Sequence, residues 1–119
     1  MAISEKPDKE TMIRALFICT QNKLRSPTAE QVFATYPEVE TDSAGLGNDA
    51  NVQLSTEQIA WASVIFVMES CHKQKLQQKF RAQLNGKRII CLNIRDEYDF
   101  MQEELVQILI KKVTPYLLR

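Results

Sequence analysis

Residues 15–27 read ALFICTQNKLRSP, which places a continuous apolar run directly before a polar turn and a Ser-Pro pair. The apolar residues 15–18 are typical of a strand that is buried on both faces, as in a parallel sheet. Ser26 and Pro27 indicate a helix start, with Ser26 as the N-cap and Pro27 at the first helical position. The stretch therefore predicts a strand ending at Cys19, a tight polar loop and a helix in direct succession.

Strand and helix patterns continue to alternate along the rest of the chain. Strand patterns cover residues 39–44, 64–68 and 89–92, and a capping box of Ser55 and Gln58 marks a helix start. Three further helices are expected, one from Ser26 to Tyr36, one ending at Asn85-Gly86, and a last one with the apolar stripe Leu105, Val106, Leu109, Ile110, Val113 and Leu117. We therefore predict a three-layer α/β/α domain with a four-stranded, mainly parallel sheet.

Composition limits the classes of protein that this chain can represent. It has 119 residues, enough for one domain, and we expect a flexible arm over residues 1–12 and a single domain over residues 13–119. The formal net charge is zero, so nucleic acid is not an expected partner. No stretch has the apolar length of a membrane helix or a signal peptide, which predicts a cytoplasmic protein without a membrane partner. The oligomeric state is left open.

Cysteine and histidine usage argues against a metal site. The chain has three cysteines, Cys19, Cys71 and Cys91, without C-x-x-C spacing, and one histidine, His72. A zinc site of the usual ligand count is therefore not expected, and we predict neither a metal nor another cofactor. Reduced thiols are the default for a cytosolic protein, so one of these cysteines can be reactive.

The loop after the first predicted strand has the composition of an oxyanion site. A loop that enters a helix turns backbone N–H groups toward one point, and the helix dipole adds positive potential there. Arg25 adds a planar guanidinium that can bind two phosphate oxygens. We therefore predict a phosphate-binding loop made of Thr20, Gln21, Asn22, Lys23, Leu24, Arg25 and Ser26.

Cys19 lies at the mouth of this predicted loop. The positive field of the loop stabilises a thiolate, and Ser26 can donate a hydrogen bond to it. A thiolate beneath a bound phosphate is placed for in-line attack, which would give a phosphocysteine intermediate without a metal ion. Two other interpretations stay open: Cys19 as an apolar filler at the end of a strand, and the loop as a phosphate-binding module without catalysis.

A family resemblance rests on three segments of the chain. Residues 19–30, the Ser43-Ala44-Gly45 triplet and the Asp96-Glu97-Tyr98 triplet resemble the low-molecular-weight protein tyrosine phosphatases, and the chain is similar to a short bacterial-type member. The resemblance implies hydrolysis of a phosphotyrosine protein or a small phosphate ester. It also implies that Asn22 bonds Ser43 to keep the loop in shape, and that Asp96 is the general acid.

Several residues near the predicted site have alternative roles. The alternative for Asp96 is a solvated turn aspartate, and its rival as the acid is Asp99, which could also be the N-cap of the last helix. Tyr98 either forms a wall for a substrate ring or packs against the sheet edge. Arsenate reductases share this fold and need a nearby resolving cysteine, and by position Cys71 is the candidate; the alternative for Cys71 is an exposed thiol at a helix start. Because ligands bind beyond the carboxyl ends of parallel strands, residues 19–26, 43–48, 68–72 and 93–99 are the places to look.

Overall fold

The computed structural model describes residues 12–117, so the predicted N-terminal arm, apart from Met12, lies outside the described residues. Strands and helices alternate through this part of the chain. Their bounds are β1 Ile13–Cys19, α1 Arg25–Phe33, β2 Val39–Gly45, α2 Thr56–Trp61, β3 Val64–Val67, α3 Ser70–Phe80, the 3-10 helix η2 Arg81–Leu84, β4 Arg88–Cys91 and α4 Glu103–Leu117.

Within residues 12–117, the four strands form one parallel sheet in the order β2-β1-β3-β4. The central strand β1 pairs with β2 so that Cys19 lies opposite Gly45, and with β3 so that Ile18 lies opposite Val67. Its residues 15–18 are fully buried, as expected for a strand that is covered on both faces. The predicted four-stranded parallel sheet is confirmed.

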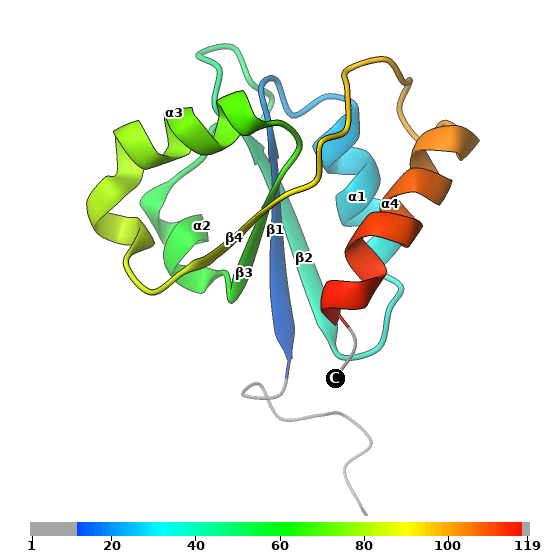
Figure 1. The fold of residues 1–119 in the computed structure, drawn as a ribbon, viewed down its shortest axis with the longest axis horizontal. Helices are drawn as coiled ribbons and strands as arrows, with labels where there is room; N and C mark the ends of the chain where they lie inside the picture. Colours follow the sequence, from blue (N-terminus) through cyan, green and yellow to red (C-terminus); the bar gives the residue numbers. More distant parts are fainter. Residues whose placement is uncertain (1–11, 118–119) are drawn as a thin grey trace, which may run out of the picture.

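Helices cover both faces of the sheet and form the outer two of three layers. Figure 1 shows α2 and α3 on one side of the sheet and α1 and α4 on the other. Because side chains alternate along a strand, Leu16 and Ile18 pack under α2 and α3, and Phe17 packs under α1 and α4. The ring of Phe17 stacks on Phe33 at a centroid distance of 5.7 Å and on Phe66 at 5.2 Å. The predicted three-layer architecture is therefore confirmed.

Some helix bounds differ from the sequence prediction. Helix α1 begins at Arg25 with Leu24 as its N-cap, so the prediction of Ser26 as N-cap was wrong, because the Ser26 hydroxyl is used by Cys19 instead. The same helix ends at Phe33, before Tyr36. The capping box of Ser55 and Gln58 is confirmed.

The loops that follow the strands lie together at one end of the molecule. In Figure 1 the turn after β1, the loop after β2 and the loop after β4 all lie at the top, above the carboxyl ends of the strands. This end carries the residues that the sequence singled out. No helix within residues 12–117 is long and apolar enough to cross a membrane.

Candidate active site

The thiol of Cys19 lies at the carboxyl end of β1, under the N-terminus of α1. Cys19 is 4% exposed, and its Sγ atom lies 2.8 Å from the Ser26 hydroxyl. The backbone N–H of Asn22 donates a second hydrogen bond to the same sulfur, at 3.2 Å. The predicted Ser26–Cys19 contact is present, and with the Asn22 N–H it supplies donors that would stabilise a thiolate.

The loop after Cys19 is tied down by its carbonyl groups. Four consecutive carbonyls, those of residues 19–22, accept hydrogen bonds from the segment that follows β2: Leu46 N–H to Cys19 at 3.0 Å, Gly47 N–H to Thr20 at 2.8 Å, Asn51 N–H to Gln21 at 3.0 Å and Asn51 Nδ2 to Asn22 at 3.1 Å. In a trans peptide the N–H group points away from the carbonyl. The N–H groups of residues 20–23 are therefore turned away from this segment, which is the arrangement of an anion-binding nest.

Gly45 lets the segment after β2 approach the loop this closely. A Cβ atom at this position would lie 2.5 Å from the Thr20 carbonyl oxygen and 2.7 Å from Ala50 Cβ. Only glycine fits between them without a shift of the backbone, so Gly45 sets the distance between the two loops. The sequence singled out this glycine only as part of a motif.

Asn22 adopts a left-handed backbone conformation and bonds across the loop. Its φ angle is 55°, a value that asparagine tolerates better than most residues. Its Nδ2 atom donates to Ser26 Oγ at 3.0 Å and to Ser43 Oγ at 2.9 Å. The Ser43 hydroxyl in turn donates to a carboxylate oxygen of Glu30. The Asn22–Ser43 bond implied by the resemblance is thus present, and Glu30 extends it.

Arg25 is buried and its guanidinium lies between two loops. Its Nη1 atom donates to Glu69 Oε2 at 2.7 Å and to the Ile94 carbonyl at 2.7 Å. Its Nε atom lies 3.7 Å from Asp96 Oδ1. The structure therefore brings Arg25 and Asp96 together. The hydrogen bond from Arg25 holds the pKa of Glu69 below its usual value.

Glu69 and His72 form a reciprocal cap at the start of α3. The Glu69 N–H donates to His72 Nδ1 at 3.1 Å, and His72 Nε2 lies 2.8 Å from the Thr20 hydroxyl. Burial, and then the nearby Arg25 charge, lowers the pKa of His72 from 6.5 to about 4. His72 is therefore neutral near pH 7, with the proton on Nε2 because Nδ1 accepts. The start of α3 thus contacts both ends of the loop, Thr20 and Arg25.

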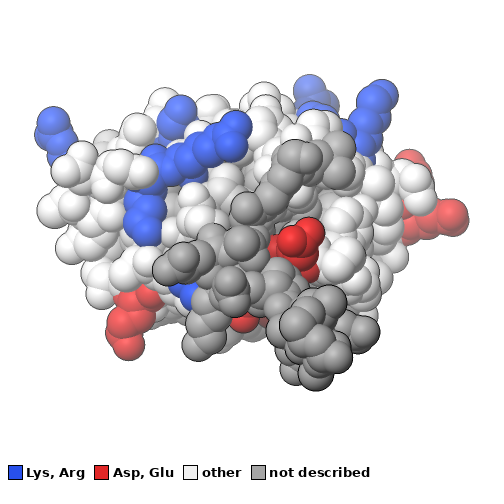
Figure 2. Space-filling model, turned by 90° about the horizontal axis from the view of Figure 1, so that it is seen from below, with Lys and Arg blue, Asp and Glu red and all other residues white. Residues whose placement is uncertain are grey.

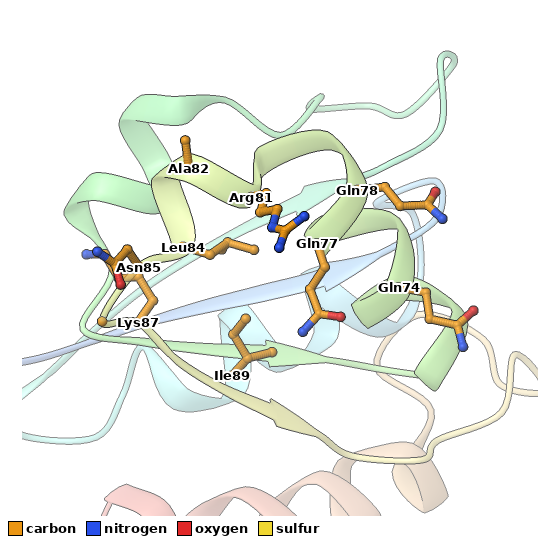
Figure 3. Close-up of a pocket in the computed structure, with 10 residues that line it drawn as sticks. Gln74, Gln77, Gln78, Arg81, Ala82, Leu84, Asn85, Lys87 and Ile89 are labelled. Atoms are coloured by element: carbon orange, nitrogen blue, oxygen red, sulfur yellow. The ribbon is translucent and has the colours of Figure 1, made fainter.

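A cavity of about 290 Å³ opens above Cys19. Its lining residues are Cys19, Thr20, Gln21, Lys23, Leu24, Arg25 and Asp96. Asp99 and Tyr98 do not line it. Tyr98 instead packs against the core cluster under α1 and α4, which is the packing alternative for this residue. A larger cavity lies elsewhere, between α3 and β4 (Figure 3).

Two functional contacts were not predicted from the sequence. Glu69 lies in the segment 68–72 flagged at the end of a strand, but a lone carboxylate there gave no sign of its Arg25 partner. Asn51 lies outside every flagged segment, and its two bonds depend on the close approach at Gly45. All three cysteines are free thiols; Cys71 is exposed and does not line the cavity.

Sequence comparison finds a similarity to phosphatases over part of the chain. The family described as low molecular weight phosphotyrosine protein phosphatase matches residues 14–60. A protein-arginine-phosphatase of Geobacillus stearothermophilus is 33% identical over 91 residues, an alignment that covers 56% of this chain and 62% of that relative. The chain thus spans less than two thirds of the length of that curated relative.

Solved structures with the same fold cover most of the chain. The YwlE arginine phosphatase from Geobacillus stearothermophilus matches 88% of this chain and 92% of its own with a TM-score of 0.68 at 23% identity. Wzb from Vibrio vulnificus, solved in complex with benzylphosphonate, matches 88% and 97% with a TM-score of 0.71 at 20% identity. These likenesses are of fold, and they agree with the loop geometry and the family match. Residues 14–60 of the chain are thus similar to the low molecular weight phosphotyrosine protein phosphatase family, and the fold of the described residues is the one seen in these solved structures.

Proposed function

We propose that this protein hydrolyses phosphorylated substrates through a phosphocysteine intermediate on Cys19. One observation carries the proposal. The Cys19 sulfur lies in a cavity next to a loop whose carbonyl groups point away from the cavity and accept hydrogen bonds from the segment after β2. That arrangement leaves backbone N–H groups and Arg25 to bind the equatorial oxygens of a phosphoryl group. A binding module would need the loop, but it would need neither the thiol nor the acid.

The chemistry proceeds in two steps that restore the enzyme. The Cys19 thiolate attacks phosphorus, the bond from phosphorus to the leaving group breaks, and Asp96 gives its proton to that group. Asp96 then takes a proton from water as the water attacks the phosphocysteine, and the phosphorus–sulfur bond breaks to return the thiolate and release phosphate. Ser26 and the Asn22 N–H stabilise the sulfur anion at both ends of this cycle.

We propose Arg25 as the residue that binds two phosphate oxygens and Glu69 as the residue that orients it. The Nη1 atom is occupied by Glu69 and the Ile94 carbonyl. The fork formed by Nε and Nη2 then remains for the phosphate, and Asp96 already lies beside Nε. Thr20, Gln21, Lys23 and Leu24 complete the cavity.

The lining of the cavity bears on the substrate. The residues that line it among the described part of the chain include no aromatic ring, so a phosphotyrosine ring finds no stacking partner there. The curated relative is a protein-arginine-phosphatase. We therefore propose a phosphorylated protein residue as substrate, with phosphoarginine accepted at least as well as phosphotyrosine. The protonated carboxyl of Asp96 would then give its proton to the leaving nitrogen, and the resulting carboxylate would accept a hydrogen bond from the released guanidinium.

Arsenate reduction is the less favoured alternative. It requires a second cysteine that can reach the first. The cavity is lined by Leu24 and by no cysteine other than Cys19, and Cys71 lies outside the lining. Cys71→Ser should leave aryl phosphate hydrolysis unchanged, and arsenate reduction that vanishes in this variant would reverse the ranking.

The test is hydrolysis of para-nitrophenyl phosphate by the wild type and Cys19→Ser, with a chelator present. We expect turnover by the wild type, loss of essentially all turnover in the variant, and retained vanadate binding in both. Mass spectrometry of the acid-quenched wild type should detect one phosphate on the peptide that contains Cys19. Equal turnover in Cys19→Ser would refute the mechanism. Measured kcat/KM for phosphoarginine and phosphotyrosine peptides then ranks the substrates.

A further inference from the structure

Basic residues are concentrated in one segment of a chain whose net charge is zero. Residues 70–95 contain seven basic residues, Lys73, Lys75, Lys79, Arg81, Lys87, Arg88 and Arg95, and all fifteen acidic residues lie elsewhere. On the face shown in Figure 2, most of the Lys and Arg side chains lie along the upper part of the view, and the Asp and Glu side chains lie lower and at the right. The segment that forms α3, η2 and β4 therefore carries a positive potential without an acidic residue of its own.

Most of these cations are not neutralised by the rest of the fold. Of the seven, only Arg95 forms an ion pair within residues 12–117, at 3.7 Å from Glu97. Lys79 and Lys87 donate to backbone carbonyls, which leaves their charge uncompensated. Arg81 is exposed and makes neither an ion pair nor a side-chain hydrogen bond with the described residues. It is a cation that is free to bind a partner.

A groove with a volume of about 1010 Å³ lies between α3–η2 and β4 (Figure 3). Gln74, Gln77, Gln78 and Arg81 line it at helical spacing, so one face of the helix turns its amides and guanidinium toward the groove. Leu84 and Ile89 supply an apolar floor. The groove thus combines hydrogen-bonding amides, the cations of Arg81 and Lys87, and apolar contacts.

The groove follows an open edge of the sheet. Strand β4 is the last strand of the sheet formed by residues 12–117. The N–H of Leu92 bonds the Val67 carbonyl at 2.9 Å, and alternate residues of a parallel strand bond the same neighbour. The backbone groups of Ile89 and Cys91 therefore face away from β3, toward the open edge. An extended segment could pair with them.

We propose that this groove binds an extended, acidic segment of a partner protein. The segment adds a strand beside β4, the glutamine amides bond its backbone, and Arg81 pairs with its carboxylates while the surrounding cations attract it. Charge complementarity selects an acidic segment over a basic one. A single-stranded nucleic acid fits less well, because the described lining residues offer no aromatic ring for stacking. Binding of this kind does not depend on the hydrolytic activity proposed above.

The test measures binding of a fluorescent (Thr-Glu)4 peptide to the full chain by anisotropy at low salt. We expect saturable binding that weakens with salt, and affinity about tenfold lower for Arg81→Glu, since an attraction between exposed charges becomes a repulsion. Lys111→Glu on α4 makes the same charge change on the opposite layer. The affinity of this variant for the (Thr-Glu)4 peptide should differ from that of the wild type by less than about twofold. The (Thr-Lys)4 peptide should not bind.

Strand pairing is tested separately by exchange and by peptide chemistry. In the complex, the backbone amides of Ile89 and Cys91 should exchange hydrogen more slowly, as measured by NMR. Methylation of alternate backbone nitrogens in the peptide, in the register that pairs, should abolish that protection. Unchanged exchange at both amides, equal weakening by Arg81→Glu and Lys111→Glu, or tighter binding of a dT12 oligonucleotide than of the peptide would each overturn the proposal.

Discussion

The Nη1 atom of Arg25 lies 2.7 Å from Glu69 Oε2, whereas its Nε atom lies 3.7 Å from Asp96 Oδ1. Arg25 thus stands between two carboxylates and makes the short contact with the one that is not expected to transfer a proton. Glu69 is 37% exposed at its side chain and Asp96 is 64% exposed. The Arg25 guanidinium is therefore held mainly by Glu69.

The first prediction tests that contact with Glu69→Gln. Loss of the charge weakens a charge-assisted hydrogen bond to Arg25, so kcat should fall about tenfold to a hundredfold. Arg25 should then pair with Asp96 and hold it in its charged form, which moves the alkaline limb of the pH–rate profile to lower pH. The measurement is kcat against pH on an aryl phosphate. Glu97→Gln, which removes an exposed acid near the same loop, is the control; identical profiles for both variants would remove Glu69 from the mechanism.

The second prediction concerns acid stability through His72. The pKa of His72 is about 4 in the fold, held down first by burial, against 6.5 for an unfolded chain. The unfolded chain therefore binds more protons between these values, so the free energy of unfolding should fall as the pH drops from about 6.5 to about 4, by about 3 kcal/mol in all. His72→Gln can keep both hydrogen bonds but does not titrate. Urea unfolding across this range should show a flatter pH dependence in the variant; an unchanged slope would show that His72 titrates normally.

The third prediction is that Gly45→Ala damages the phosphate loop. The added Cβ would meet the Thr20 carbonyl at 2.5 Å, so one of the two loops must shift. We expect vanadate affinity to fall at least about tenfold and the free energy of unfolding to fall by about 1–3 kcal/mol. Gly86→Ala is the matched control, because Gly86 has φ of 79° but no atom within 4 Å of its Cβ position. That variant should lose stability and keep vanadate affinity; equal affinity in both variants would contradict the role of Gly45.

The fourth prediction assigns the general acid. Asp96→Asn should lower kcat by about 10²- to 10⁴-fold, most for poor leaving groups that need a proton. Asp99→Asn should have little effect, because Asp99 does not line the cavity. The measurement is kcat for a series of aryl phosphates of increasing leaving-group pKa. If kcat falls steeply with increasing leaving-group pKa in Asp99→Asn and only slightly in Asp96→Asn, the two residues exchange roles.

Sequence reasoning located the fold and most of the candidate site because both depend on local patterns. The run before Cys19 indicated a buried strand, and the Ser55 capping box indicated a helix start. The N-cap of α1 could not be predicted. A Ser-Pro pair has the same sequence pattern whether the serine hydroxyl caps a helix or hydrogen-bonds a thiol. Glu69 and Asn51 could not be assigned either, since their partners lie far away in the sequence and depend on the register of three strands.

The ties between the segment after β2 and the loop after β1 have a consequence for the order of folding. The Asn51 side chain reaches the Asn22 carbonyl, and His72 reaches Thr20, so we expect the loop to acquire its shape only after β1, β2 and β3 have assembled. A chain whose sheet is half formed would hold no phosphate. The rate at which phosphate or vanadate affinity returns during refolding therefore reports the last step of assembly, later than any signal from helix content.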